Sequence, residues 1–514
     1  MIIHQDNNWL VVDKPSGMAT HAGKPGELGA VEWLELHLGL KTHVVSRLDR
    51  GTSGVLLLAL DAHASARAEE IHESGDAIKI YEFFSAVDSS AGGAGKTWTR
   101  KDELDGKPAT TRFQRLEKTP RGDLVRYRAE ITRGRRHQIR RHAAASGIPV
   151  LGDEEYGGAD FPRLMLHCAE ARWPEIKEPL VATDPASFIA LASGASSAFA
   201  VCRDRRGNWP ATVSDAFRVV HRDEIAGLPA AVEVFGDWFN ATWFDETSSA
   251  EKLTKLLHPV LDEVTAAHGC RGGVIRTHRR NPHQRALVVE TRVMGETPPD
   301  IFTVSEHGLK YEVSLTKTQH VGLFLDQRDT RRRLALVAAG KRLANLFAYT
   351  CSFSVAAVAA EAEVAFSVDT ARAGLNTGKT NFDLNGLKEG GRGKFIQEDV
   401  RKWLLRQERR RDEKPGEFHP LDLVVCDPPV FASAKDGGKF LLESEWPRLA
   451  AQAAGLMEPG GIAVFANNHR SGNHAFYRRA LEDHFREVTD LRPPLDFPVF
   501  PKRPHHVRTF WCIK

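Results

Sequence analysis

Five apolar segments in the second half of the chain alternate with helix-like segments, and no other feature constrains the fold as strongly. They cover residues 342–349, 364–369, 394–399, 421–427 and 461–467. Strands that alternate with helices in this way form a doubly wound, mostly parallel sheet, and ligands bind beyond the carboxyl ends of such strands. We therefore expect an α/β domain with a site in the loops that follow these strands.

The whole chain is too long for a single domain. At 514 residues it predicts two to about four domains. The 42% hydrophobic and 27% charged residues are ordinary for a soluble globular enzyme. No apolar run approaches the ~20 residues of a membrane span, and the first residues lack the features of a signal peptide. We expect a cytoplasmic protein without membrane contact.

Charge and cysteine content constrain the function less. A net charge of +3 does not by itself indicate a nucleic-acid binder, but arginines crowd residues 133–141 and form runs at 331–333 and 409–411. Such patches bind phosphates even in a near-neutral protein, although a solvated face is the alternative. The six cysteines are scattered with no CxxC pair, so we expect no metal and no disulfide framework.

Asp49 is the first catalytic candidate. It lies between Arg47 and Arg50 in a loop that also holds Gly51 and Gly54, just before the apolar run 55–60. A carboxylate between two arginines, delivered onto a buried strand, is held fixed and partly desolvated. An ordinary salt-bridged loop aspartate is the competing interpretation.

The segment Arg-Leu-Asp-x-x-Thr-Ser-Gly at 47–54 resembles the signature of the RluA family of RNA pseudouridine synthases. The resemblance implies that Asp49 is the nucleophile. The family usually has His where this chain has Ser46. A Lys-Pro-x-Gly turn at 14–17 and a Lys-x-Tyr strand that contains Tyr81 also resemble this family, which makes Tyr81 the active-site tyrosine.

A second motif of the same family follows. Gly-Arg-x-His-Gln-Ile-Arg at 134–140 and Gly-Asp-x-x-Tyr-Gly at 152–157 resemble it closely. Arg140 is then the residue that pairs with Asp49 and keeps it ionised and oriented. The resemblance gives the remaining polar side chains of this region an RNA-binding role: Arg47, Arg133, Arg135, Arg136, His137 and Gln138.

The reaction that the resemblance implies is isomerisation of uridine to pseudouridine without a cofactor. Asp49 acts at the sugar, either as nucleophile at the anomeric carbon or as base at the neighbouring carbon, and the sequence does not choose between these routes. Tyr81 can stack on an extruded pyrimidine and handle the proton lost from C5.

The middle of the chain is less specific. Residues 183–210 are rich in Ala and Ser and resemble a linker, although a helix over the domain junction is the alternative. From residue 211 the chain resembles the central domain of ribosomal-RNA methyltransferases of the RlmI and RlmK type, a small α+β domain. Arg276, Arg279 and Arg280 form a further candidate RNA patch there.

Gly-Leu-Phe-Leu-Asp-x-Arg at 322–328 resembles the opening segment of the same methyltransferase group, which uses S-adenosylmethionine on a Rossmann-like class I domain. The resemblance places the 345–352 loop near the methionine part of the cofactor, Asp369 at the ribose and Asp399 near the adenine. The family normally has Gly at the position of Cys351. The full set of expected cofactor-binding residues is Asp326, Arg328, Asn345, Phe347, Tyr349, Asp369, Asp399, Asp427 and Pro428.

Asp-Pro-Pro-x-Phe at 427–431 resembles the loop that faces the target base, so Asp427 is a catalytic candidate and Phe431 an RNA-binding one. Methylation at pyrimidine C5 needs a thiol nucleophile after the fifth strand, where this chain has Asn467. That resembles the RlmK branch, which methylates guanine N7 in large-subunit ribosomal RNA, a reaction that positioning alone can accelerate.

The sequence thus predicts a bifunctional RNA-modification enzyme of mixed α/β and α+β architecture. A mixed antiparallel-sheet synthase domain covers 1–182, a linker 183–210, a central α+β RNA-binding domain 211–315, and a methyltransferase domain 316–514. The expected partner is 23S ribosomal RNA or a large-subunit precursor. Two alternatives stay open: only one half is active, or the chain is a non-catalytic, RNA-binding ribosome assembly factor.

Overall fold

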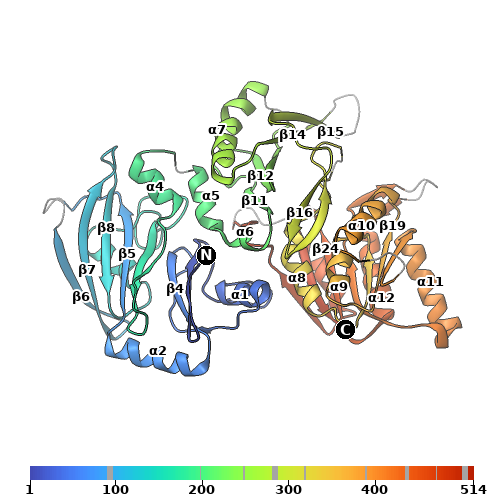
Figure 1. The fold of residues 1–514 in the computed structure, drawn as a ribbon, viewed down its shortest axis with the longest axis horizontal. Coiled ribbons are helices and arrows are strands. Elements are labelled where there is room, and N and C mark those ends of the chain that lie inside the picture. The colour runs from blue at the N-terminus through green and yellow to red at the C-terminus, as the bar shows by residue number, and fades with distance from the viewer. Residues whose placement is uncertain are drawn as a thin grey trace.

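The computed structural model describes residues 1–89, 96–196, 198–246, 249–280, 287–317, 320–387, 391–433, 439–470, 472–500 and 507–514. Most of the glycine-rich turn expected at 89–95 and the side chains of Arg279 and Arg280 lie outside the described residues. Figure 1 shows an N-terminal sheet domain (blue to cyan), a C-terminal layered domain (orange to red) and a smaller central sheet between them (green to yellow). No helix among the described residues has the length and apolarity needed to cross a bilayer.

The N-terminal domain is built on one ten-stranded sheet. Its order is β1-β2-β4-β9-β5-β8-β7-β6, with β3 along β4 and β10 along β9. Among the described strands of this sheet, every pairing is antiparallel except that of β4 with β9. The strands are Ile2–Gln5, Trp9–Lys14, His43–Val44, Ser53–Ala59, Ile78–Ser85, Thr97–Leu104, Lys107–Lys118, Val125–Ile131, Leu166–Arg172 and Leu180–Val181 (β1–β10), and the helices are Ala30–Leu38, Ala62–Ser74 and Gln138–Ala145 (α1–α3).

The parallel contact between β4 and β9 needs a glycine. Gly54 has a φ of +108°, and a Cβ on it would lie 2.2 Å from the carbonyl oxygen of Cys168. Only glycine tolerates both that conformation and that approach. Cys168 is also the register partner of Tyr81 on β5, so this close contact brings the loop before β4 next to the tyrosine strand.

Residues 183–210, expected to be a linker, are helical and packed. They form α4 (Ala186–Ser193), α5 (Ala198–Arg206) and α6 (Trp209–Val213). Asp204 makes a buried ion pair with Arg163 at 2.7 Å, and the fully buried Trp209 donates its ring N–H to the carbonyl of Asp13. The alternative helical interpretation is therefore the correct one, because tertiary contacts order this Ala/Ser-rich segment.

The central sheet has the order β11-β12-β13-β14-β15. Helix α7 (Ala250–His268) connects the parallel strands β13 and β14 and buries Leu257, Leu261 and Val264 against the sheet. A separate hairpin, β16–β17, follows. The strands are Ala216–Val220, Ala230–Phe235, Trp238–Trp243, Gly272–Arg280, Leu287–Gly295, Phe302–Glu306 and Leu309–Val313 (β11–β17).

The expected doubly wound sheet is confirmed in the C-terminal domain. Its order is β20-β19-β18-β21-β24-β26-β25. The pairings of β26 with β24 and with β25 are antiparallel, and the other pairings are parallel. The strands are Arg342–Leu346, Val364–Asp369, Gly393–Gln397, Leu421–Cys426, Met457–Asn467, Glu487–Leu491 and Arg508–Ile513 (β18–β21, β24–β26), with a small hairpin of Phe431–Ser433 and Lys439–Leu441 (β22, β23). The helices are Arg328–Leu336, Ser352–Ala359, Arg372–Leu384, Val400–Glu413, Leu442–Gly455 and His474–Glu482 (α8–α13), and the 3₁₀ turns are Leu325–Gln327 and Pro415–Glu417.

Buried ion pairs join the three parts of the molecule. Arg328 at the start of α8 donates to both carboxylate oxygens of Asp496, at 2.8 and 3.2 Å, and to the carbonyl of Ala216 on β11. Asp496 also accepts from the backbone N–H of Arg218, and its carbonyl accepts from Arg206 on α5. The carboxylate and the backbone carbonyl of Asp496 together thus connect helix α5, the central sheet and the C-terminal domain.

We expect Arg328→Met to lower the free energy of unfolding by roughly 3–5 kcal/mol, because it leaves Asp496 buried without its counter-ion. Thermal and denaturant unfolding measure the effect. The control is Arg392→Ala, which removes one partner of the exposed Arg392–Glu361 pair and should change stability by less than about 0.5 kcal/mol. Equal effects of the two variants would contradict a central role for Asp496.

Candidate active sites

A cleft of about 1460 Å³ opens on the N-terminal domain, and the Asp49 loop forms part of its wall. Backbone and hydroxyl contacts hold this loop. Thr20 donates to the carbonyl of Leu48 and accepts from its N–H, at 3.0 and 3.1 Å. The turn before it contributes two further bonds, from Gly17 N–H to the Arg50 carbonyl and from the Ser16 hydroxyl to the Gly51 carbonyl. The loop is therefore fixed before any ligand binds.

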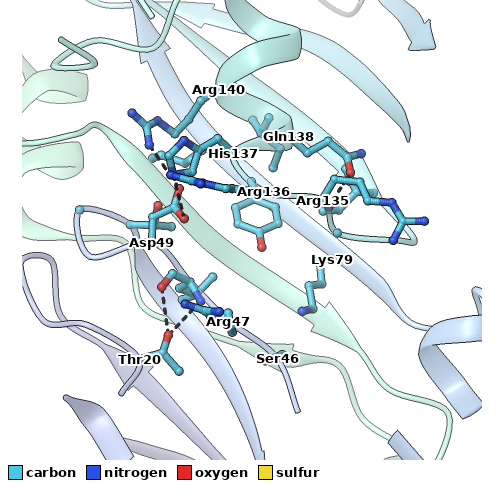
Figure 2. A pocket seen from close by; sticks show the side chains of 18 of the residues that line it. Thr20, Ser46, Arg47, Asp49, Lys79, Arg135, Arg136, His137, Gln138 and Arg140 are labelled. Carbon is cyan, nitrogen blue, oxygen red and sulfur yellow. Dashed lines mark hydrogen bonds and ion pairs between the residues drawn. The ribbon is translucent and has the colours of Figure 1, made fainter. Parts of the chain in front are cut away.

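The structure brings Asp49 and Arg140 together, as Figure 2 shows. Arg140 Nη1 lies 3.5 Å from Asp49 Oδ2, and His137 Nε2 lies 3.7 Å from Asp49 Oδ1. The Asp49 side chain is 34% exposed. One carboxylate thus faces the cleft with a guanidinium and an imidazole beside it.

Neighbouring side chains in turn hold the Arg140 guanidinium. Asp153, whose side chain is fully buried, accepts from Arg140 Nε and Nη2, each at 2.7 Å. Glu155 accepts from Nη2 at 3.0 Å, and the guanidinium lies over the ring of Tyr156 at 4.9 Å. Asp153 and Tyr156, which belong to the Gly-Asp-x-x-Tyr-Gly segment, set the direction of Nη1 toward Asp49. Asp153 was not among the predicted site residues, although its motif was recognised.

The second motif forms the turn into α3. His137 has a φ of +52°, an uncommon conformation for a side chain of this size, and its Nδ1 lies 3.0 Å from the Tyr156 hydroxyl. Gln138 is buried and bonds to the backbone of Arg135 and of Thr110. Gln138 therefore shapes the turn, although it also lines the cleft, and its RNA-binding role stays a prediction.

The predicted arginines of this site do line the cleft. Arg47, Arg133 and Arg136 are exposed and Arg135 is partly buried. Figure 2 places Arg47, Arg135 and Arg136 around Asp49. Arg133 also donates to the carbonyl of Glu73. Their arrangement makes the entrance of the cleft cationic.

Tyr81 and Lys79 line the same cleft from β5. Burial, with Cys168 beside it, raises the pKa of the Tyr81 phenol well above its usual value, so the hydroxyl keeps its proton near neutral pH. Burial lowers the pKa of Lys79. Ser46 lies behind these groups, where its hydroxyl donates to the carbonyl of Leu57.

A buried lysine that sequence reasoning did not select lies below the loop. Lys14 is fully buried, and its Nζ donates to the carbonyls of Pro15 and Met18. Burial and the nearby Arg163 lower its pKa to about 7. The Lys-Pro-x-Gly turn was the signal for it.

The loop after β18 is the strained part of the C-terminal domain. Phe347, Tyr349 and Cys351 have φ values of +59°, +48° and +61°, each in a region that side chains other than glycine rarely adopt. Asp369 at the end of β19 accepts from the backbone N–H of Tyr349 at 2.9 Å and of Ala371 at 2.7 Å. Strain of this kind is maintained at functional sites when surrounding contacts fix it.

The side chain of Cys351 points into the protein. It is fully buried, and a Cβ on Gly378 of α10 would lie 2.4 Å from its sulfur. Burial raises the pKa of this thiol to about 12. The chain thus accommodates a cysteine at the usual glycine position through a glycine on the neighbouring helix.

The other predicted residues of this half separate into two groups. Asp326, Phe347, Asp369, Asp399 and Asp427 are partly exposed, and Phe431 is 55% exposed. Asp399 begins α11 and pairs with Arg401 at 2.8 Å. The buried group has internal partners: Arg328 pairs with Asp496, Asn345 donates to Ser354, and Asn467 accepts from the His469 N–H. Pro428 is also buried.

We expect Gly378→Ala to lower the free energy of unfolding by about 1–3 kcal/mol, since the added methyl overlaps the Cys351 sulfur. The double variant Cys351→Gly/Gly378→Ala should recover most of that loss, because the methyl then fills the space of the thiol. Denaturant unfolding of both single variants and the double variant measures this coupling. Additive effects would show that the two side chains do not share one space.

We expect the stability of the Asp427→Asn variant relative to the original chain to rise with pH. Burial and the neighbouring Asp326 carboxylate raise the pKa of Asp427 from 3.8 to about 7. Between these two pH values the Asp427 carboxyl is ionised in the unfolded chain but protonated in the folded protein. The free energy of unfolding of the original chain therefore falls as the pH rises. Melting temperatures across this range measure the difference. A pH-independent difference would show that Asp427 has no raised pKa.

Comparison with known proteins matches both halves. The model of the S-adenosylmethionine-dependent methyltransferase family covers residues 233–500, and that of RNA pseudouridylate synthase covers residues 8–145. No metal-binding group of three or more His, Cys, Asp or Glu is present among the described residues.

Curated relatives align with the methyltransferase half. Ribosomal RNA large subunit methyltransferase K of Neisseria meningitidis is 35% identical over 260 residues, 50% of this chain and 70% of the relative. Methyltransferase K/L of Pseudomonas putida is 31% identical over 59% of this chain and 40% of the relative, and methyltransferase I of Erwinia tasmaniensis is 33% identical over 43% and 56%. The chain thus spans less than two thirds of the last two.

The crystal structure of SMU.776 complexed with SAH shares the fold at 24% identity, with a TM-score of 0.53 over 62% of this chain and 80% of that one. The chain belongs to the S-adenosylmethionine-dependent methyltransferase family and carries an RNA pseudouridine synthase domain ahead of its methyltransferase domain.

Proposed function

We propose that this chain is a bifunctional enzyme that isomerises a uridine and methylates a guanine at N7 in 23S ribosomal RNA. Asp49 and its partner Arg140 carry the first assignment, because the carboxylate faces a large cationic cleft at 3.5 Å from the guanidinium. The similarity to ribosomal RNA large subunit methyltransferases supports ribosomal RNA as the substrate. We place the synthase in residues 1–182, the RNA-binding domain in 211–315 and the methyltransferase in 316–514.

In the synthase half, Asp49 attacks the sugar of an extruded uridine as nucleophile or base. Either role needs an ionised carboxylate, which Arg140 and His137 stabilise. The phenol of Tyr81, which keeps its proton, stacks on the detached base and can donate a hydrogen bond to it. The exposed arginines bind the phosphates on either side of the flipped nucleotide.

In the methyltransferase half, S-adenosylmethionine supplies a methyl group on a sulfonium. The loop 347–351 and Asp369 are the groups we assign to holding it, since Asp369 fixes the backbone of that loop and remains partly exposed. Asp399 is our assignment for the adenine. Phe431 is exposed and can stack on the face of the target base. We assign Asp427 to the edge of the same base.

Nitrogen is the atom we assign as methyl acceptor. Methylation at pyrimidine C5 proceeds through an accessible thiolate, and all six cysteines are described and buried. Burial raises the pKa of Cys426, next to Asp427, well above its usual value. A guanine N7 carries its own lone pair, so holding it in line with the methyl group suffices.

We expect the two activities to be lost independently. Nucleoside analysis of 23S RNA from a strain lacking the gene should show the loss of one pseudouridine and one 7-methylguanosine, both restored by the original chain. Asp49→Asn should restore only the 7-methylguanosine and Asp427→Ala only the pseudouridine. Normal levels of both nucleosides in the deletion strain would favour a non-catalytic assembly factor, and loss of one alone would leave a single active half.

A further inference from the structure

Glu155 occupies an unexpected position in the synthase cleft. Among the described residues, the carboxylates within 4 Å of the Arg140 guanidinium are those of Asp49, Asp153 and Glu155. Glu155 Oε2 lies 3.0 Å from Arg140 Nη2, and its Oε1 lies 3.6 Å from His137 Nδ1. The side chain is 53% exposed. It therefore bridges the same guanidinium and imidazole that flank Asp49.

The contacts of Glu155 are not needed to orient Arg140. Asp153 already accepts two bonds of 2.7 Å from the guanidinium and is fully buried. Tyr156 adds its ring beneath Arg140 and its hydroxyl on His137. An ion pair as exposed as that of Glu155 contributes little to stability. Its carboxylate can leave while the buried contacts keep Arg140 and His137 in place.

The surroundings indicate what replaces it. Arg47, Arg135 and Arg136 lie around the same opening (Figure 2), so the cleft attracts a polyanion. A carboxylate and a phosphate bind the same N–H donors with similar geometry. An approaching phosphate is repelled by Glu155 and attracted by Arg140 and His137.

We propose that Glu155 occupies, in the free protein, the binding position of one RNA phosphate, and that the phosphodiester next to the target nucleotide displaces it. This inference rests on the proposed synthase function and adds a phosphate subsite formed by Arg140 and His137. Glu155 then weakens RNA binding, because its carboxylate must move before the phosphate can approach. In the free protein, the Arg140 guanidinium and the His137 imidazole are thus paired with Glu155, and they exchange it for a phosphate when RNA binds.

The test compares Glu155→Gln with Glu154→Gln in the full chain. Both glutamates are exposed and line the cleft, so each variant removes one negative charge from the same surface. Fluorescence anisotropy with a uridine-containing single-stranded RNA measures the dissociation constant. We expect Glu155→Gln to lower it about two- to fivefold, Glu154→Gln to leave it nearly unchanged, and the KM for pseudouridine formation to fall with Glu155→Gln.

Two results would overturn the proposal. An equal drop in the dissociation constant for both variants would mean a general charge effect on the cleft. A lower kcat for Glu155→Gln without a lower KM would mean that Glu155 positions Arg140 for the reaction. The binding comparison needs no catalysis, so a failure of the proposed synthase function, seen as no pseudouridine from the original chain, is distinguishable from a failure of the phosphate subsite.

Discussion

The buried pairing of Asp496 with Arg328 is the interaction on which the arrangement of the whole molecule depends. It sits where α5, β11 and α8 meet, and Glu306 and Arg331 extend it with bonds of 2.7 and 2.8 Å. Removing such charges from water is costly unless each finds a well-directed partner. The ion pair itself lies within the C-terminal domain, and the bonds that link it to the other parts are those from Arg328 to the Ala216 carbonyl, from the Arg218 N–H to the Asp496 carboxylate and from Arg206 to the Asp496 carbonyl. Arg328, expected to bind a cofactor, serves this joint instead.

Both candidate sites follow the same plan, in which buried contacts fix a loop so that a few exposed groups are free for a ligand. In the first domain, Thr20 and the 14–17 turn hold the backbone around Asp49, and Asp153 holds Arg140. In the last domain, Asp369 accepts from the backbone N–H of Tyr349, in the middle of a loop where Phe347, Tyr349 and Cys351 have positive φ. Prepared geometry of this kind lowers the reorganisation that binding or reaction requires.

Sequence reasoning succeeded where information is local. The apolar alternation predicted five of the seven strands of the C-terminal sheet to within a few residues and missed β25 and β26. The synthase motifs and the Lys-x-Tyr strand selected Asp49, Tyr81 and Arg140, which line one cleft. It failed where a side chain's role depends on distant partners. Composition alone did not reveal that Asp204 and Trp209 pack the 183–210 segment, and no motif indicates that Gln138 turns inward. The space for the Cys351 thiol comes from Gly378, on a different helix.

The position of Asp496 in the chain determines when its contacts can form during synthesis. Among the described elements, only β26 follows Asp496, while Arg328, Arg206 and Ala216 precede it by long stretches of sequence. Domains usually fold in turn as a chain emerges from the ribosome. The synthase domain can therefore fold early, whereas the contacts of Asp496 with α5, β11 and α8 form only after nearly all of the other elements have been made.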